Sequence, residues 1–475
     1  MNNSRKTKIV CTMGPASLNE DTLTKMFRAG MNVARFNFSH GTHEYHKNGI
    51  ELVRQVRDKM KLPAAILLDT KGPEIRIGTL NNGAVTLEKG QQYIFTTEEG
   101  YGDSERVSIT YKDLPREIKI GDKLLLDDGR LDLRVEEIKD TEIICRVQVG
   151  GVLTNRKSIN IPNAHLNMPY ISERDELDLR FGIEMDVDFV AASFVRSKND
   201  VIELRKLLNY YGGHKIKIIA KIENAEGVEN FEEILANCDG IMIARGDMGV
   251  EIEFEKLPGI QKKFIRKCYQ AGKMVITATQ MLETMIHSKT PTRAEITDVA
   301  NAVFDGTSAV MLSGETAMGD HPAHVVDVMA KIVKQAESDA IALKVYEGVR
   351  YDSDIFDMTN AICDAACTTA RDIKAKAIIA VTSSGTTARR VSKFRPSEAI
   401  VAATPDIKTY HQLALSWGVS PVLALVQDDT DKLFLHAIDC ARRLDIVSKG
   451  DKVVITAGVP LRQSGTTNLL KVETV

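Results

Sequence analysis

Short apolar runs alternate with amphipathic stretches along most of the chain. Stretches such as NEDTLTKMFRAG and NDVIELRKLLNYYGG place apolar residues at helical spacing. Eight of the apolar runs have the length and composition of buried strands: TKIVCTM, MNVARFNF, AAILLDT, VDFVAASFV, KIIAKIE, GIMIARGD, KMVITAT and AVMLSGE. This repeated strand-then-helix order predicts a parallel sheet and an α/β fold.

One region breaks the pattern and a second restarts it. Residues 71–165 are rich in Gly, Thr and alternating strands, and they predict an inserted all-β domain without a helix. The flanking segments, 1–70 and 166–345, then hold about 250 residues for the eight units, the typical size of a closed (β/α)8 TIM barrel. An open doubly wound sheet is the alternative. The pattern from residue 346 predicts a separate, open α/β domain over 346–475.

Composition narrows the class of protein. The 43% hydrophobic and 27% charged residues are typical of a globular chain. The 62 basic residues nearly balance the 65 acidic ones, which argues against nucleic acid or an anionic membrane as a partner. The seven cysteines are scattered without a C-x-x-C pair, and the N-terminus lacks a signal-peptide pattern. We therefore expect reduced thiols and a cytoplasmic protein.

Polar side chains gather where the predicted strands end. The active sites of closed α/β barrels are built from the carboxyl ends of the strands. Because residues two apart on a strand share a face, Lys221 and Glu223 should both point into the barrel mouth. The same arrangement is expected at four other strand ends: Arg35, Asn37 and Ser39; Asp69 and Thr70, followed by Glu74 and Arg76; Arg245 and Asp247; and Thr277 and Thr279.

These residue types favour phosphoryl transfer at a metal ion. Glu223 and Asp247 would supply hard oxygen ligands to Mg²⁺. Lys221 would stabilise charge on a phosphoryl group in transit, while Arg35 and Arg76 would hold phosphate in bidentate fashion. For any one strand end alone, a solvated rim or a structural ion pair is the plainer interpretation. Five such ends together favour one enclosed polar ligand.

Two further groups of oxygen and nitrogen atoms accompany this centre. Asn37, Ser39, Asp69 and Thr70 form a cluster with a single carboxylate, which suits a monovalent cation. In RGD, the backbone N–H groups of Gly246 and Asp247, with the hydroxyl of Thr279, can bind a carboxylate.

The chain resembles the pyruvate kinase family over nearly its whole length. The matching stretches are KTKIVCTMGPAS, ARFNFSHG, LLDTKGPEIR, IAKIENAEG, ARGDMGVE, ITATQMLETM, PTRAEITDVANAVFDGTSAVMLSGETA and SGTTN. The resemblance implies a (β/α)8 barrel with an inserted β-barrel lid, a C-terminal regulatory domain and a homotetramer. It also implies transfer of phosphate from phosphoenolpyruvate to ADP, with Mg²⁺ (or Mn²⁺) and K⁺ as cofactors.

The resemblance also implies roles for individual residues. The residues at the reaction centre keep the roles just given. The resemblance implies that Arg76 and Thr279 are catalytic together with Lys221, and that the monovalent cation is K⁺. The implied nucleotide-binding residues are Asn37, His40, Arg76 and Lys157. In the family, Glu at the position of Glu74 accompanies potassium dependence and Lys accompanies independence. We therefore expect this enzyme to require K⁺.

A hydroxyl-rich loop marks the C-terminal domain. VTSSGTTARR follows a predicted strand and opens a helix, a geometry that can cradle phosphate. A Ser/Thr-rich helix cap without a ligand is the alternative. The resemblance implies a phosphorylated activator here, with fructose 1,6-bisphosphate, ribose 5-phosphate and AMP all open. The expected effector residues are Thr382, Ser383, Ser384, Gly385, Thr386, Thr387, Arg462 and Gly465.

Two other functions fit parts of the pattern. Barrel lyases and aldolases also use a Mg²⁺ ion bound by acidic residues and an arginine to stabilise pyruvate enolate, but they need neither ADP nor an inserted domain. A sugar-phosphate sensor would use the C-terminal domain alone, and the charged strand ends would then be dispensable.

Overall fold

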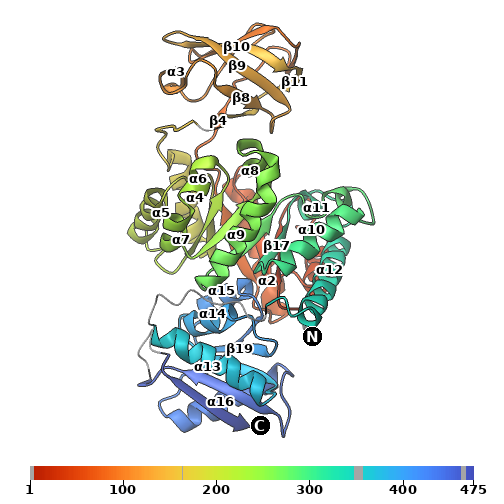
Figure 1. Cartoon of the computed structure of the whole chain (residues 1–475), viewed down its shortest axis with the longest axis vertical. Coiled ribbons are helices and arrows are strands. Elements are labelled where there is room, and N and C mark those ends of the chain that lie inside the picture. Colours follow the sequence, from red (N-terminus) through yellow and green to blue (C-terminus); the bar gives the residue numbers. More distant parts are fainter. Residues whose placement is uncertain (1–4, 163, 347–356, 462–466) are drawn as a thin grey trace.

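The computed structural model describes residues 5–162, 164–346, 357–461 and 467–475. Figure 1 shows three bodies stacked in a column. A small β domain lies at one end, the barrel lies in the middle, and the C-terminal domain packs against the opposite end of the barrel. The two outer bodies therefore contact different ends of the same barrel.

Eight parallel strands close the central barrel in the order β1-β17-β16-β15-β14-β13-β3-β2. They correspond to the eight apolar runs of the sequence: β1 Lys8–Thr12, β2 Val33–Asn37, β3 Ala65–Asp69, β13 Phe189–Ala192, β14 Lys217–Ile222, β15 Gly240–Ala244, β16 Met274–Ala278 and β17 Ala309–Leu312. The predicted closed barrel is confirmed, and the open doubly wound alternative is wrong.

Helices surround the barrel and begin where the sequence supplies caps. Ser172, Ser197 and Thr292 each form a capping box with an acidic residue three positions later. The helices of this part are α1 Glu20–Ala29, α2 His43–Lys59, α4 Glu173–Glu184, α5 Lys198–Tyr210, α6 Ala225–Glu229, α7 Phe231–Asn237, α8 Arg245–Glu251, α9 Leu257–Gln270, α10 Arg293–Phe304, α11 Gly314–Ala317 and α12 Pro322–Ala342, with short 3-10 turns at Phe254–Lys256 and Glu283–Ile286.

Strand alternation divides the barrel core into two layers. Inward residues such as Leu67, Ile219 and Ile276 form a closed inner cluster. Their neighbours, such as Ile66 and Ile218, belong to the cluster between strands and helices. Two residues of the C-terminal domain, Ala414 and Leu415, complete the inner cluster. The carboxyl ends of the strands are left for polar residues at the other end.

The inserted domain is mainly β, with one correction to the prediction. A four-residue helix, α3 Leu114–Glu117, begins at a proline-containing turn, so the expectation of no helix is wrong. Its strands are β4 Ile75–Arg76, β5 Ala84–Leu87, β6 Gln92–Thr96, β7 Arg106–Ser108, β8 Lys123–Leu126, β9 Leu131–Ile138, β10 Glu142–Val149, β11 Gly151–Thr154 and β12 Ser158–Asn160. We propose domain boundaries at 70/71, 165/166 and 345/346, because all barrel strands lie within 8–69 and 189–312.

The C-terminal domain is an open five-stranded sheet in the order β20-β19-β18-β21-β22, with β22 antiparallel to β21. Apolar clusters cover both faces. Its elements are α13 Met358–Asp372, β18 Ala377–Val381, α14 Thr386–Lys393, β19 Ala399–Thr404, α15 Ile407–Gln412, a 3-10 turn at Leu413–Leu415, β20 Val419–Leu423, α16 Thr430–Arg443, β21 Lys452–Ala457 and β22 Leu469–Thr474.

Two predictions about the whole chain can be compared with the structure. All seven cysteines lie within the described ranges and are buried free thiols, as expected. Among the described residues, no helix has the length and apolar character needed to span a membrane.

Candidate active site

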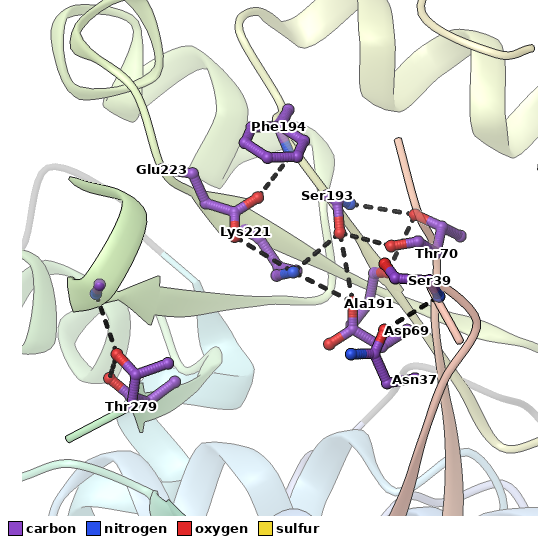
Figure 2. A network of polar contacts seen from close by, with 12 residues as sticks. Asn37, Ser39, Asp69, Thr70, Ala191, Ser193, Phe194, Lys221, Glu223 and Thr279 are labelled. Carbon is purple, nitrogen blue, oxygen red and sulfur yellow. Dashed lines mark hydrogen bonds and ion pairs between the residues drawn. The ribbon is translucent and has the colours of Figure 1, made fainter. Parts of the chain in front are cut away.

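Lys221 lies at the centre of the barrel mouth. It is 9% exposed, and its Nζ lies 3.0 Å from Asp69 Oδ1 and 3.1 Å from Glu223 Oε1. Ile222, between the two charged residues, packs in the cluster under the helices. The period of the strand therefore brings Lys221 and Glu223 together as predicted (Figure 2).

Opposite charges hold the lysine in its ionised form. Burial alone would lower the pKa of Lys221, but the carboxylates of Asp69 and Glu223 outweigh this effect and raise it above the ordinary lysine value. Burial would likewise raise the pKa of Asp69, yet the neighbouring Arg35 and Lys221 lower it. The site therefore keeps a fixed positive charge in a water-poor environment, where electrostatic interactions are strongest.

Glu223, which is buried, and Asp247, which is partly exposed, form a coupled carboxylate pair. Burial, with a smaller contribution from the Asp247 carboxylate, outweighs the opposing effect of Lys221 and raises the pKa of Glu223 to about 8. Burial also raises the pKa of Asp247, while Lys221 and a hydrogen bond with Glu223 oppose the rise. Two carboxyl groups that resist joint ionisation are suited to a divalent cation, which would hold both in the charged form.

The donor set fits a metal that shares its ligands with a substrate. In the parts of the chain that the structure describes, no group of three or more His, Cys, Asp or Glu side chains is arranged to hold a metal ion. Two carboxylates beside open space are enough for Mg²⁺, which commonly keeps water or takes substrate oxygens as further ligands. Glu223 and Asp247 are the residues that would hold it.

The two arginines predicted to face phosphate have different surroundings. Arg35 is buried, and its guanidinium donates to Asp69 Oδ2 at 2.6 Å and to Thr12 Oγ1 at 2.7 Å. Arg76 lies on β4 beyond the barrel and forms a two-point ion pair with Glu74, with its Nε 2.8 Å from Glu74 Oε2. Arg35 is thus fixed within the barrel mouth, whereas Arg76 reaches the site from the inserted domain.

The RGD segment departs from the strand geometry that the sequence predicts. Arg245 and Asp247 do not share a strand face, because the chain enters helix α8 at Arg245. The Arg245 side chain is buried, pairs with Asp298 at 2.7 Å, and donates to the carbonyls of Ala278 and Thr279 at the carboxyl end of β16. Its role is therefore to hold the chain that carries Thr279.

Thr279 occupies a strained turn beside α8. Thr279 and Gln280 both have positive φ, 65° and 54°, which non-glycine residues rarely adopt. The Thr279 hydroxyl accepts a hydrogen bond from the Gly246 N–H at 2.9 Å, so these two predicted substrate-binding groups contact each other. Thr277 was expected at the mouth, but it is fully buried outside the inner barrel and bonds to Thr307.

The predicted monovalent-cation cluster lies beside Lys221. Asn37 Oδ1 accepts from the Ser39 N–H at 3.1 Å, and Thr70 Oγ1 lies 3.4 Å from the carbonyl of Ala191. Asp69, the single carboxylate, forms ion pairs with Arg35 through Oδ2 and with Lys221 through Oδ1. The four residues lie close together in Figure 2. Their role in binding K⁺ stays a prediction.

A cavity of about 480 Å³ separates the barrel mouth from the inserted domain. His40 and Arg76, both predicted to face nucleotide, line it together with Asp247. Lys157 also lines it and forms an ion pair of 2.6 Å with Asp127 of the same domain. Residues of the barrel and of the inserted domain therefore both line the cavity, and its shape depends on the relative position of these two domains.

Sequence reasoning missed two residues of this network. Ser193 follows β13, and its hydroxyl contacts Lys221 Nζ at 2.8 Å and Asp69 Oδ1 at 3.2 Å. Thr12 ends β1 and accepts from Arg35. Ser193 lies two residues beyond the inward-facing Ala191, so the same alternation that identified Glu223 could have found it.

The hydroxyl-rich loop of the C-terminal domain also borders a cavity, of about 270 Å³. Gly385 has φ 78° and is the N-cap of helix α14, which explains the glycine at this position. Its N–H donates to Thr382 Oγ1 at 3.0 Å. The predicted effector residues on the cavity wall are Thr382, Ser383, Ser384, Thr386 and Thr387. Arg462 and Gly465 lie outside the described residues.

The fold and the mouth together define a phosphotransferase built on a (β/α)8 barrel, and comparisons with known proteins identify the family. Residues 4–326 match the family model for the pyruvate kinase barrel domain, and residues 360–473 match the model for the pyruvate kinase alpha/beta domain. The chain belongs to the pyruvate kinase family.

Individual relatives are similar over nearly the whole of this chain. A pyruvate kinase of Clostridium acetobutylicum is 47% identical over 99% of this chain and 100% of its own. One of Staphylococcus epidermidis is 48% identical over 99% of this chain and 80% of its own. A crystal structure of a pyruvate kinase from Cryptosporidium parvum superposes with a TM-score of 0.92 at 40% identity, covering 99% of this chain and 96% of that one.

Proposed function

We propose that the chain catalyses the last step of glycolysis, phosphoryl transfer from phosphoenolpyruvate to ADP, with Mg²⁺ or Mn²⁺ and K⁺ as required cations. The observation that carries this proposal is the Lys221 ammonium, held between Asp69 and Glu223 beside Asp247 at the barrel mouth. Membership of the family accounts for the two substrates. The geometry supports the roles of individual residues.

Each residue would act at a stated group. Lys221 would stabilise the negative charge that spreads over the transferring phosphoryl oxygens, and Arg35 and Arg76 would hold phosphate. Glu223 and Asp247 would bind the divalent ion, which supplies charge neutralisation and orients the substrates when bound. The N–H groups of Gly246 and Asp247, with Thr279, would hold the substrate carboxylate. His40, Asn37 and Lys157 would face the nucleotide.

The Lys221 ammonium is expected to increase the rate of phosphoryl transfer strongly because its position is fixed. A unit charge about 4 Å from the phosphoryl oxygens, at an effective dielectric near 20, is worth about 4 kcal/mol. That corresponds to about a thousandfold in rate. Because the ammonium is already held by Asp69 and Glu223, little reorganisation is needed during the reaction.

A coupled assay tests the proposal. ATP formed from phosphoenolpyruvate and ADP should depend on Mg²⁺ or Mn²⁺, and it should fall when K⁺ is replaced by a tetraalkylammonium ion. A rate unaffected by that replacement would contradict the K⁺ requirement, and the absence of ATP under all conditions would contradict the reaction.

We also propose regulation by a phosphorylated small molecule at the C-terminal domain. The hydroxyl-lined cavity at the start of α14 supports this proposal, because backbone N–H groups and hydroxyls at a helix N-terminus bind phosphate. Calorimetric titration with fructose 1,6-bisphosphate, ribose 5-phosphate and AMP should give binding for one of them. No heat from any of the three would overturn it. The homotetramer and the cytoplasmic location implied by the resemblance stay predictions.

A further inference from the structure

A tight turn at Ser193–Phe194 links parts of the barrel mouth that are distant in sequence. It follows strand β13, and Phe194 has φ 54°, a strained conformation for an aromatic residue. Figure 2 shows Ser193 at the centre of the polar network, between Lys221 and Thr70. Strain of this kind persists only where the surrounding structure holds it.

The Ser193 hydroxyl has a defined hydrogen-bonding polarity. The Lys221 ammonium has no lone pair, so it donates to Ser193 Oγ across 2.8 Å. The single hydroxyl hydrogen is then available to an acceptor, and the Thr70 carbonyl oxygen lies 2.6 Å away. Asp69 Oδ1 is a more distant acceptor at 3.2 Å. Ser193 therefore presents a lone pair to the ammonium from a fixed direction.

The next residue orients the neighbouring carboxylate. The Phe194 N–H donates to Glu223 Oε2 at 2.6 Å, while Glu223 Oε1 faces Lys221 at 3.1 Å. One turn thus contacts both members of the Lys221–Glu223 pair. It contacts the ammonium through a side chain and the carboxylate through the backbone.

The chain segments that connect the barrel to the inserted domain hold the turn. The Ser193 N–H donates to Thr70 Oγ1 at 3.1 Å, and the Tyr170 hydroxyl donates to the Ser193 carbonyl at 3.2 Å. Gly72 packs so closely that a Cβ atom there would lie 2.9 Å from Ser193 Cβ. Thr70 immediately precedes the inserted domain, Gly72 lies at its start, and Tyr170 follows it, so both connections contact the turn.

We propose that the Ser193–Phe194 turn is a positioning element for phosphoryl transfer, with Ser193 setting the place of the Lys221 ammonium. The inference rests on the proposed role of Lys221, because Ser193 acts through that residue. The same turn also contacts Thr70, Gly72 and Tyr170, so it joins the Lys221 site to both connections of the inserted domain.

Paired assays separate this role from a structural one. Ser193→Ala should lower kcat for phosphoryl transfer about 10- to 100-fold, the usual effect of losing a hydrogen bond to a charged group. Enolisation of pyruvate, measured by exchange of its methyl hydrogens with solvent deuterium, moves no phosphoryl group. It should therefore change by no more than about twofold.

Ser308→Ala is the matched control. Ser308 is a buried barrel serine whose hydroxyl accepts from the Val275 N–H at 3.2 Å, at the start of strand β17 rather than at the mouth. Its variant should keep both activities within about twofold of the parent. Ser193→Cys keeps the branching of the side chain but places a larger and weaker acceptor atom beside Lys221, and it should lose part of the transfer rate. If Ser193→Ala does not fold, Ser193→Cys is judged by the same criteria.

Two results would overturn the inference: phosphoryl transfer by the Ser193 variant within about twofold of the parent, or equal losses in transfer and enolisation. Lys221→Met, measured alongside, identifies which idea fails. If Lys221→Met keeps its transfer rate, the proposed role of Lys221 fails. If it loses that rate while the Ser193 variant does not, only the positioning role fails.

Discussion

The barrel mouth and the hydroxyl-rich loop of the C-terminal domain both lie at the carboxyl end of a parallel strand, but their polar groups are held in different ways. At the mouth, Lys221 and Asp69 are 152 residues apart in sequence and form a buried ion pair. In the loop, Gly385 and Thr382 are three residues apart and bond locally. The mouth therefore depends on the pairing of several barrel strands. The loop combines this local bond with longer-range ones, from the Thr409 hydroxyl to the Ser383 carbonyl and between the hydroxyls of Thr387 and Thr467.

The difference predicts where substitutions will have their largest effects. Charges at the mouth act on one another across strands in a water-poor setting, so removing one should affect catalysis strongly. Hydroxyls in the loop are neutral, and those of Ser383, Ser384 and Thr386 belong to partly or fully exposed residues, so each of these three should contribute modestly to binding. Four experiments sharpen this comparison.

Lys221→Met should have the largest effect. Loss of the fixed charge should lower kcat for phosphoryl transfer about a thousandfold. Lys217→Met is the matched control, because Lys217 begins the same strand and pairs with Asp239 away from the mouth. Steady-state kinetics with phosphoenolpyruvate and ADP measure both. Equal losses in the two variants would show that strand β14, rather than the ammonium, is responsible.

Glu251→Gln should change how stability depends on pH. Burial raises the pKa of Glu251 to about 7, and its carboxyl accepts from Asn160 of the inserted domain at 3.1 Å. A raised acid pKa means that the folded state favours the protonated form. Stability is therefore lost as pH rises from about 4.5 to about 7, by up to about 3 kcal/mol.

Thermal melting between pH 5 and 8 measures that change. The Tm of the parent should fall as pH rises over this range. The Tm of Glu251→Gln should fall less, because a neutral amide does not titrate. Glu255→Gln, an exposed neighbour, should behave like the parent. Parallel melting curves for the parent and Glu251→Gln would refute the assignment.

Glu74→Lys should relax the K⁺ requirement. The lysine ammonium would supply a positive charge on the wall of the cavity at the barrel mouth and would break the ion pair with Arg76. Activation by K⁺ over a tetraalkylammonium ion should fall by about tenfold, equivalent to about 1.4 kcal/mol. Glu88→Lys makes the same charge change at an exposed site of the inserted domain and should leave the K⁺ response unchanged. An undiminished requirement in Glu74→Lys would count against the family rule for this chain.

Ser384→Ala should have the smallest effect. Its hydroxyl lies 3.0 Å from Thr386 Oγ1 on the cavity wall. Loss of one neutral hydrogen bond should weaken binding of a phosphorylated activator by about fivefold, equivalent to about 1 kcal/mol. Isothermal titration calorimetry measures this, with the exposed Ser397→Ala as control. A thousandfold loss would mean that the loop is as tightly coupled as the mouth, and the comparison would fail.

Periodicity was sufficient for the architecture and for part of the site. The eight apolar runs correspond to the eight barrel strands, and the two-residue alternation placed Lys221 and Glu223 on one face. The same alternation gave a wrong result at Arg245 and Thr277. At Arg245 the chain had already entered helix α8, and Thr277 faces out of the barrel.

The sequence by itself determined which residue types end each strand, because side-chain direction along a regular strand depends only on local geometry. Only the tertiary structure decided which of them meet. Ser193 contacts Lys221 and Phe194 contacts Glu223 where β13 and β14 lie side by side, and Arg35 contacts Asp69 where β2 and β3 do. The tertiary structure also decided the directions in which the pKa values at the mouth shift, because burial and the distances between charges exist only in the folded chain.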